Sequence, residues 1–125
     1  MTTALQAFDN QQYLTLETFR KNGQGVKTPV WFARDGDSLR VWTESGSGKA
    51  KRIRRDGRVR IAPSSGSGQP LGAWEDAHAV AEDSPEALSH VVKLFKKKYG
   101  LMFSVFGQLG KMRSATYTTI TIQPC

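Results

Sequence analysis

Short stretches in which apolar and polar residues alternate, separated by turn sequences, occupy the first two thirds of the chain. A period of two is typical of β-strands that bury one face. The pattern predicts five strands here, over residues 13–20, 26–34, 38–43, 58–64 and 73–81. The first three are joined by short turns rich in Gly and Asp, which favours an antiparallel meander.

Two of these strands show how they should be placed in a sheet. In the third strand, Leu39 and Val41 should point inward and Arg40 and Trp42 outward, because neighbouring side chains face opposite sides. Pro29, in the second strand, has no amide hydrogen to donate to a neighbour. We therefore expect the second strand to lie at an edge or to contain a bulge.

The periodicity changes in the last third of the chain. Ser84 and Pro85 are typical of a helix start, and apolar residues then recur at helical spacing up to Gly100. A second short helix is predicted over 101–112, and a β-prone final strand over 115–123. Six strands with a late helical hairpin indicate a mainly β (α+β) fold, a small closed antiparallel barrel that the last strand seals.

The length and composition are those of a globular protein. The chain has 125 residues, so one domain over 1–125 is expected. Its 38% hydrophobic and 23% charged residues exclude collagen, coiled coil and extensive disorder. No membrane helix or signal peptide is expected, and the single cysteine, Cys125, fits a cytoplasmic location. Without paired His or Cys motifs, no metal site is expected.

Positive charge is concentrated in one segment. The chain has a net charge of +7, and residues 49–60, the basic window, contain seven basic residues and one acid, a net charge of +6. A concentrated positive segment indicates an anionic partner: nucleic acid, an anionic surface or a phosphorylated small molecule. A solvated charged face without a partner is the alternative.

A Gly/Ser loop, TESGSGKA at residues 43–50, leads into the basic window. It differs from the phosphate loop of nucleotide triphosphatases, because Thr43 replaces the first Gly of that motif and Ala50 its final hydroxyl residue. Phosphate binding is still favoured locally, since exposed backbone amides and a helix start would join Thr43, Ser47 and Lys49 around one phosphate. A flexible surface loop is the alternative.

The segment FRKNGQGVKTPVWFARDGDSLRVWTESGSGKAKRIRRDGRVRIAP closely resembles the split-barrel flavin-binding proteins of the pyridoxamine 5′-phosphate oxidase superfamily. It looks most like the branch of deazaflavin (coenzyme F-420) dependent oxidoreductases. The resemblance continues through GQPLGAWEDAHAVAEDSPE and KKKYGLMFSVFGQLGKMR, and so covers nearly the whole chain. It implies a six-stranded antiparallel split β-barrel of the FMN-binding type, which forms homodimers and holds the flavin or deazaflavin ring at the dimer interface.

Matching positions imply which residues bind the cofactor. The ring-lining residues would be Thr28, Pro29, Val30 and Trp31, the phosphate-binding residues Thr43, Ser47, Gly48 and Lys49, and the residues flanking the cofactor tail Lys51 and Arg52. No catalytic residue is assigned. The oxidase branch has an Arg and a Lys on the second strand, where this chain has Thr28 or Pro29 and Ala33. This departure argues against pyridoxamine-phosphate oxidase activity.

The implied function is hydride transfer between coenzyme F-420 or FMN and an unknown small-molecule substrate. The cofactor carries that chemistry, so no conspicuous acid or nucleophile is needed. The basic window favours the long anionic tail of F-420 over the single phosphate of FMN. Two alternatives stay open: a non-catalytic cofactor carrier or sensor, and a small barrel that binds nucleic acid. Because the basic residues and the tryptophans lie on separate segments, nucleic acid is not expected as a partner. A membrane is not expected either, because the chain has no apolar stretch of about 20 residues.

Overall fold

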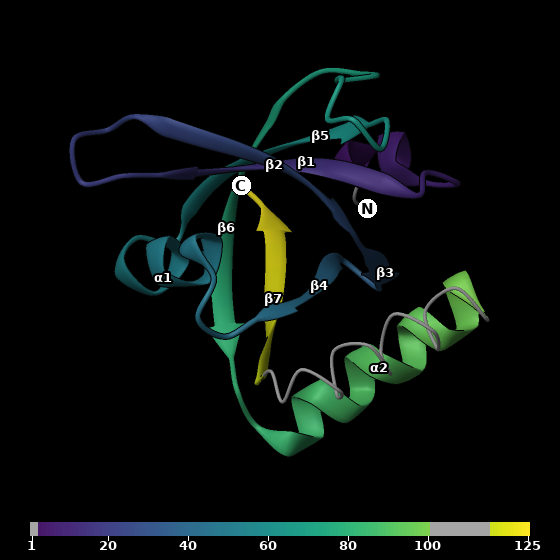
Figure 1. The fold of residues 1–125 in the computed structure, drawn as a ribbon. Coiled ribbons are helices and arrows are strands. Elements are labelled where there is room, and N and C mark those ends of the chain that lie inside the picture. The colour runs from purple at the N-terminus through teal and green to yellow at the C-terminus, as the bar shows by residue number, and fades with distance from the viewer. Residues whose placement is uncertain (1–2, 101–115) are drawn as a thin grey trace.

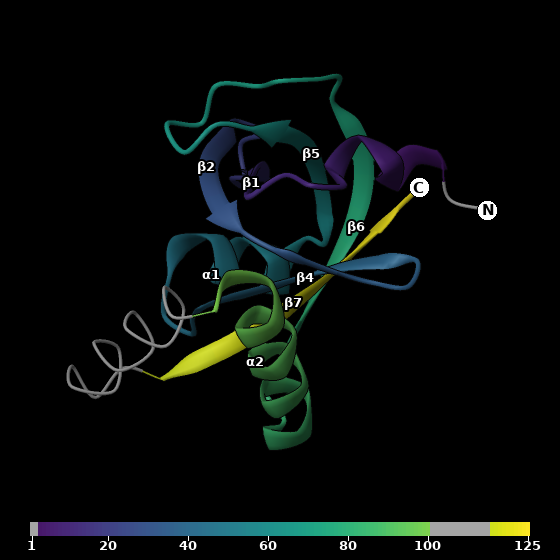
Figure 2. The ribbon, with the colours of Figure 1, turned by 90° about the vertical axis from the view of Figure 1, so that its right-hand side faces the viewer.

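In the described part of the chain, seven antiparallel strands form one strongly curled sheet, accompanied by two α-helices (Figure 1, Figure 2). The computed structural model describes residues 3–100 and 116–125. The strands are β1 (Tyr13–Phe19), β2 (Gly25–Trp31), β3 (Ala33–Asp35), β4 (Ser38–Glu44), β5 (Arg58–Ser64), β6 (Glu75–Glu82) and β7 (Tyr117–Pro124). The helices are a short 3-10 helix, η1 (Thr3–Phe8), and the α-helices α1 (Gly48–Arg55) and α2 (Pro85–Tyr99).

The sheet closes through the chain itself. The strand order is β2-β1-β5-β6-β7-β4-β3, and every pairing is antiparallel. The two edge strands, β2 and β3, follow one another in the sequence with only Phe32 between them. The sheet therefore curls until its edges meet at Phe32. This arrangement confirms the expected mainly β antiparallel split barrel.

The single strand expected over 26–34 is wrong, because the chain breaks at Phe32 into β2 and β3 and so forms seven strands where six were predicted. β2 pairs with β1 and β3 with β4, so the first three predicted strands form two hairpins rather than a continuous meander. At the break, the Phe32 amide donates to the Tyr99 hydroxyl at 3.0 Å, and its carbonyl accepts from Lys98 Nζ at 2.7 Å. Helix α2 thus satisfies backbone groups that a strand would otherwise pair.

Inward-facing side chains of most strands form the apolar core. Leu39 and Val41 are fully buried on β4, whereas Arg40 and Trp42 on the other face are half-buried, as the alternation predicts. Pro29 lies on the edge strand β2, which confirms the position expected for a residue without an amide hydrogen. The main core cluster contains Leu5, Phe8, Leu14, Leu16, Phe32, Leu39, Val41, Ile53, Val59, Ile61, Ala77, Ala79, Ile120 and Ile122.

Both α-helices begin at capping serines. The Oγ of Ser47 accepts a hydrogen bond from an amide in the first turn of α1, and Ser84 does the same for α2. Helix α2 ends at Gly100, whose φ of 61° is a backbone conformation that favours glycine. The second helix predicted over 101–112 lies outside the described residues.

The final strand completes the barrel as predicted. β7 lies between β6 and β4 and pairs with both, which joins the end of the chain to its middle. Helix α2 packs against β3, β4 and β7 and so covers the side of the barrel next to the break at Phe32. None of the helices within residues 3–100 and 116–125 combines the length and the apolar character that a membrane span requires.

Candidate functional site

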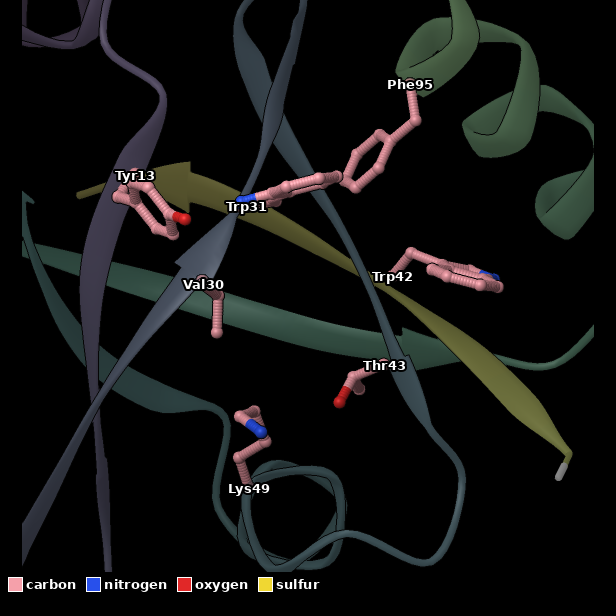
Figure 3. A pocket seen from close by; sticks show the side chains of 7 residues that line it. All are labelled: Tyr13, Val30, Trp31, Trp42, Thr43, Lys49 and Phe95. Carbon is pink, nitrogen blue, oxygen red and sulfur yellow. The ribbon is translucent and has the colours of Figure 1, made fainter. Parts of the chain in front are cut away.

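An open pocket of about 390 Å³ lies where β1, β2, β4, α1 and α2 converge (Figure 3). Its lining residues are Tyr13, Val30, Trp31, Trp42, Thr43, Lys49 and Phe95. In Figure 3 the rings of Tyr13, Trp31 and Phe95 lie at the top of the pocket, and Thr43 and Lys49 reach into it from below. The pocket therefore combines flat apolar surfaces with one positive group at the opposite end.

The aromatic side chains that line the pocket pack against other aromatic rings of the protein. Trp31 stacks on Tyr99 with ring centroids 4.3 Å apart and planes 9° from parallel, and Tyr13 meets Trp31 edge-on at 6.4 Å. Trp42 stacks on Tyr117 at 4.2 Å. Stacked and edge-on geometries of this kind stabilise aromatic pairs beyond the area that they bury. The pocket thus presents a preformed surface on which a planar ring can pack.

Lys49 brings positive charge to the other end of the pocket. It lies in the first turn of α1 and its side chain is half-buried. Burial, and then the neighbouring Arg52, lower the pKa of Lys49, while Glu44 acts in the opposite direction. Interactions within the protein therefore do not fully offset the cost of keeping Lys49 protonated. An anionic group beside Lys49 would stabilise the ammonium form.

Arg52 lies close to the start of α1 and adds to the positive potential there. Its Nε donates to Thr18 Oγ1 at 2.6 Å, which directs the guanidinium toward the barrel. A Cβ at Gly48 would come within 2.8 Å of Arg52 Nη1, so the glycine allows this close approach. The start of α1 thus offers Lys49 next to free helical amides, with Arg52 one turn further along the helix, a favourable environment for phosphate.

The structure brings together only some of the residues implied by the resemblance. Val30, Trp31, Thr43 and Lys49 line one pocket. Ser47, Gly48 and Arg52 lie at or near the start of α1, although the Ser47 hydroxyl is engaged as the helix cap. Thr28 is half-buried on β2, and among the described residues its buried Oγ1 has no hydrogen-bond partner. Pro29 and Lys51 are exposed and do not line the pocket.

Three further lining residues were not among those implied. Tyr13 begins the strand predicted over 13–20, Phe95 is one of the apolar residues of the helix predicted to end at Gly100, and Trp42 was expected to point outward from its strand. The outward position of Trp42, directly before Thr43, is the one sequence signal that could have found it. Tyr13 and Phe95 reach the pocket only because β1 and α2 pack beside β2 and β4.

The basic window does not form a single patch. Arg54 donates to the Ser45 carbonyl at 2.8 Å, and Arg55 to the Phe19 carbonyl at 2.5 Å. Arg60, on β5, pairs with the buried Glu17 at 3.2 Å. These arginines stabilise the fold around α1 and β5. Near the start of α1, such contacts leave Lys49 and Lys51 for a ligand, whereas the Nε of Arg52 is bonded to Thr18.

Neither a family model nor a curated protein matches this chain. Solved structures do match it along nearly its full length. The heme storage protein HutZ from Vibrio cholerae has a TM-score of 0.71 at 15% identity, covering 98% of this chain and 87% of its own. A candidate pyridoxamine 5′-phosphate oxidase from Listeria innocua has a TM-score of 0.66 at 14% identity, with coverage of 97% and 90%. An F420 reductase has a TM-score of 0.63 at 17% identity, with coverage of 97% and 92%.

The curled seven-stranded sheet, its closure at Phe32 and these similarities agree with one another. At identities below 20%, the three structures establish a common fold rather than a common activity. This chain has the split β-barrel fold of the pyridoxamine 5′-phosphate oxidase-like proteins.

Proposed function

We propose that this protein is an oxidoreductase that binds coenzyme F-420 or FMN and transfers hydride to or from a small-molecule substrate. The observation that carries the proposal is the convergence of Trp31 and Lys49 on one pocket. A flavin or deazaflavin cofactor has a planar ring at one end and a phosphate near the other. The pocket offers an aromatic wall and an under-compensated ammonium in the same arrangement.

The residues present fit such a cofactor. Trp31 and Val30 would contact the ring, and Lys49 with Thr43 and the first amides of α1 would hold the phosphate. Thr28 lies two residues before Val30 on β2, and its buried Oγ1 has no hydrogen-bond partner among the described residues, but it does not line the pocket. A bound cofactor would supply the hydride chemistry, and these residues would bind and orient it. We assign no catalytic acid or base.

The homodimer expected from the resemblance remains part of this proposal. Trp31, Trp42, Val92 and Leu94 are only partly buried around a small apolar cluster beside the pocket. Apolar surface next to an open site is typical of an interface, and two-fold dimers are the commonest assembly. We expect light scattering at micromolar concentration to give twice the mass of the 13.8 kDa chain. A monomer under these conditions would contradict the dimer.

Titration of the apo-protein with F-420 and with FMN, followed by fluorescence, tests the function. We expect F-420 to bind more tightly at low salt, by several-fold to about thirtyfold. The exposed Lys51 and the nearby Arg52 can pair with its anionic tail, and each exposed pairing contributes a few tenths to about 1 kcal/mol. Salt screens such pairs, so the preference should narrow as salt is raised to about 0.5 M.

A matched pair of variants separates tail binding from general charge. Lys51→Gln should reduce the preference for F-420, whereas Lys97→Gln, at an exposed position on α2, should leave it unchanged. Equal affinity for FMN and F-420 at every salt concentration would indicate an FMN-binding protein without a tail site. Failure of both cofactors to bind would contradict the proposed function.

The alternatives predict different spectra and different ligands. A carrier or sensor would bind the cofactor, but no electron donor or acceptor would support its catalytic reduction or oxidation. For heme, iron is held by His, Cys, Met or Tyr, and among the described lining residues only Tyr13 is of these types. His78 is exposed on β6, and His90 Nε2 lies 2.9 Å from Asp35 Oδ2. The absorbance spectrum of the purified protein therefore distinguishes flavin, deazaflavin and heme directly.

A further inference from the structure

A separate pocket of about 400 Å³ lies between the turn that follows η1 and the end of α2. It is lined by Asn10, Gln11, Gln12, Lys98 and Tyr99. Every lining residue has a polar side-chain group, and three of them are amides. Asn10 has a φ of 65°, a left-handed conformation that Asn tolerates better than most residues, and it turns the chain so that the amides follow one another along the pocket.

Lys98 is the cation of this second pocket. Its Nζ donates to the Phe32 carbonyl at 2.7 Å and lies 3.6 Å from the centroid of the Phe32 ring. Among the described residues, no carboxylate is within ion-pair distance of Lys98. Burial alone lowers the pKa of Lys98 to about 8. Although Lys98 as a residue is exposed, its ammonium is thus held against the Phe32 carbonyl and ring without a counter-charge.

The acidic and phenolic groups nearby do not supply that charge. Asp9, which precedes the amide-bearing turn, is paired with Arg34 at 2.8 Å, and Asp35 on β3 is paired with Arg40 and His90. Burial raises the pKa of Tyr99 well above its usual value, so its hydroxyl stays neutral at physiological pH. An external anion is what the second pocket lacks.

Tyr99 makes this pocket rigid. Its hydroxyl accepts from the Phe32 amide at 3.0 Å and lies 2.7 Å from the carbonyl oxygens of Gln12 and Phe32, one of which takes its hydrogen. The Tyr99 ring also stacks on Trp31, which lines the aromatic pocket described above. A ligand therefore meets walls that are already in place, which reduces the entropy cost of binding.

We propose that this second pocket binds a small organic carboxylate, with Lys98 pairing with the carboxylate and the side-chain amides of Asn10 and Gln12 donating hydrogen bonds to it. One ammonium with amide donors suits a singly charged carboxylate better than a phosphate dianion, which usually recruits several cations or a helix N-terminus. The volume is in the range of small-molecule sites. The proposal does not depend on the cofactor.

The test follows the Lys98 side chain by ¹³C NMR in protein labelled at lysine, with sodium lactate as the probe. Binding to the ammonium form must raise the pKa of Lys98 by linkage, and we expect an increase from about 8 to about 9 at saturating lactate. This rise in the pKa of Lys98 corresponds to a lactate affinity about tenfold weaker above pH 9 than at pH 7. The signal of the exposed Lys97 should not respond.

Two controls make the outcome decisive. Lys98→Gln should weaken lactate binding about tenfold at pH 7 and remove its pH dependence, and Lys97→Gln should leave both unchanged. Sodium chloride and sodium phosphate at the same ionic strength should not move the Lys98 signal as lactate does. If Lys98 titrates with the same pKa in sodium lactate as in sodium chloride, the proposal is overturned. This measurement needs no variant. Tighter binding of phosphate than of lactate would overturn the carboxylate assignment.

Discussion

Replacing Lys49 with Ala should weaken binding of F-420 or FMN by about 1.5–3 kcal/mol, or roughly 10- to 150-fold in dissociation constant. Lys49 is the only Lys or Arg among the described residues that line the aromatic pocket, and its burial leaves the ammonium under-compensated. A phosphate beside it would form a charge-assisted hydrogen bond. Alanine favours helix, so α1 should persist in the variant. Fluorescence titration of the apo-protein measures the change.

The exposed Lys51, on the same helix, provides the matched control. Lys51→Ala removes the same charge but should change FMN affinity no more than a few-fold, because an exposed pair contributes little. An unchanged dissociation constant in Lys49→Ala would mean that the phosphate binds elsewhere.

The pH dependence of cofactor affinity tests whether Lys49 binds the phosphate through its positive charge. The phosphate binds the protonated amine, so affinity should fall as pH rises and Lys49 loses its proton. Because burial and Arg52 lower the pKa of Lys49, this fall should begin at a lower pH than for an ordinary lysine. The Lys49→Ala variant should show no such fall over the same range. A wild-type affinity independent of alkaline pH would contradict the assigned role.

Replacing Phe32 with Ala should lower the free energy of unfolding by about 3–5 kcal/mol, the usual range for a buried Phe. Phe32 is 1% exposed and packs edge-on against Phe8, with ring centroids 5.9 Å apart. It is the single residue between the two edge strands, β2 and β3. Its loss would leave a cavity where the barrel closes and remove the ring beneath Lys98. Urea denaturation followed by tryptophan fluorescence measures the change.

Leu71 serves as the control for Phe32. It is a large apolar residue that is 58% exposed, so Leu71→Ala should alter stability by less than about 0.5 kcal/mol. A loss of less than about 1 kcal/mol in Phe32→Ala would show that closure of the barrel does not depend on this side chain.

Local sequence patterns predicted most elements because their causes are local. Alternation placed Leu39 and Val41 inward, the missing amide hydrogen of Pro29 predicted either an edge strand or a bulge, of which the structure has the edge, and Ser84 marked the start of α2. Each of these depends on the residue itself and on its nearest neighbours in the chain. The Gly/Ser loop likewise predicted the place where α1 begins and where Lys49 meets the pocket.

The site was only partly predictable for the same reason. Val30, Trp31, Thr43 and Lys49 were identified through a motif resemblance and do converge. The arginines of the basic window looked like one anionic-ligand surface. The structure instead uses Arg54, Arg55 and Arg60 to bind backbone carbonyls and a buried carboxylate. Charge along a sequence does not reveal which partners the fold will bring to it.

The amino-acid sequence by itself determined the periodicities of the strands and helices, the capping residues and the polar chemistry next to α1. Only the tertiary structure decided that the chain breaks at Phe32, that Tyr13 and Phe95 join the pocket, and that the Lys98 ammonium lies against the Phe32 carbonyl and ring without a counter-charge. These features depend on contacts such as that between the Phe32 amide and the Tyr99 hydroxyl, 67 residues apart in sequence. Side-chain periodicity specifies which face of an element is buried, whereas the packing of distant elements determines what that face meets.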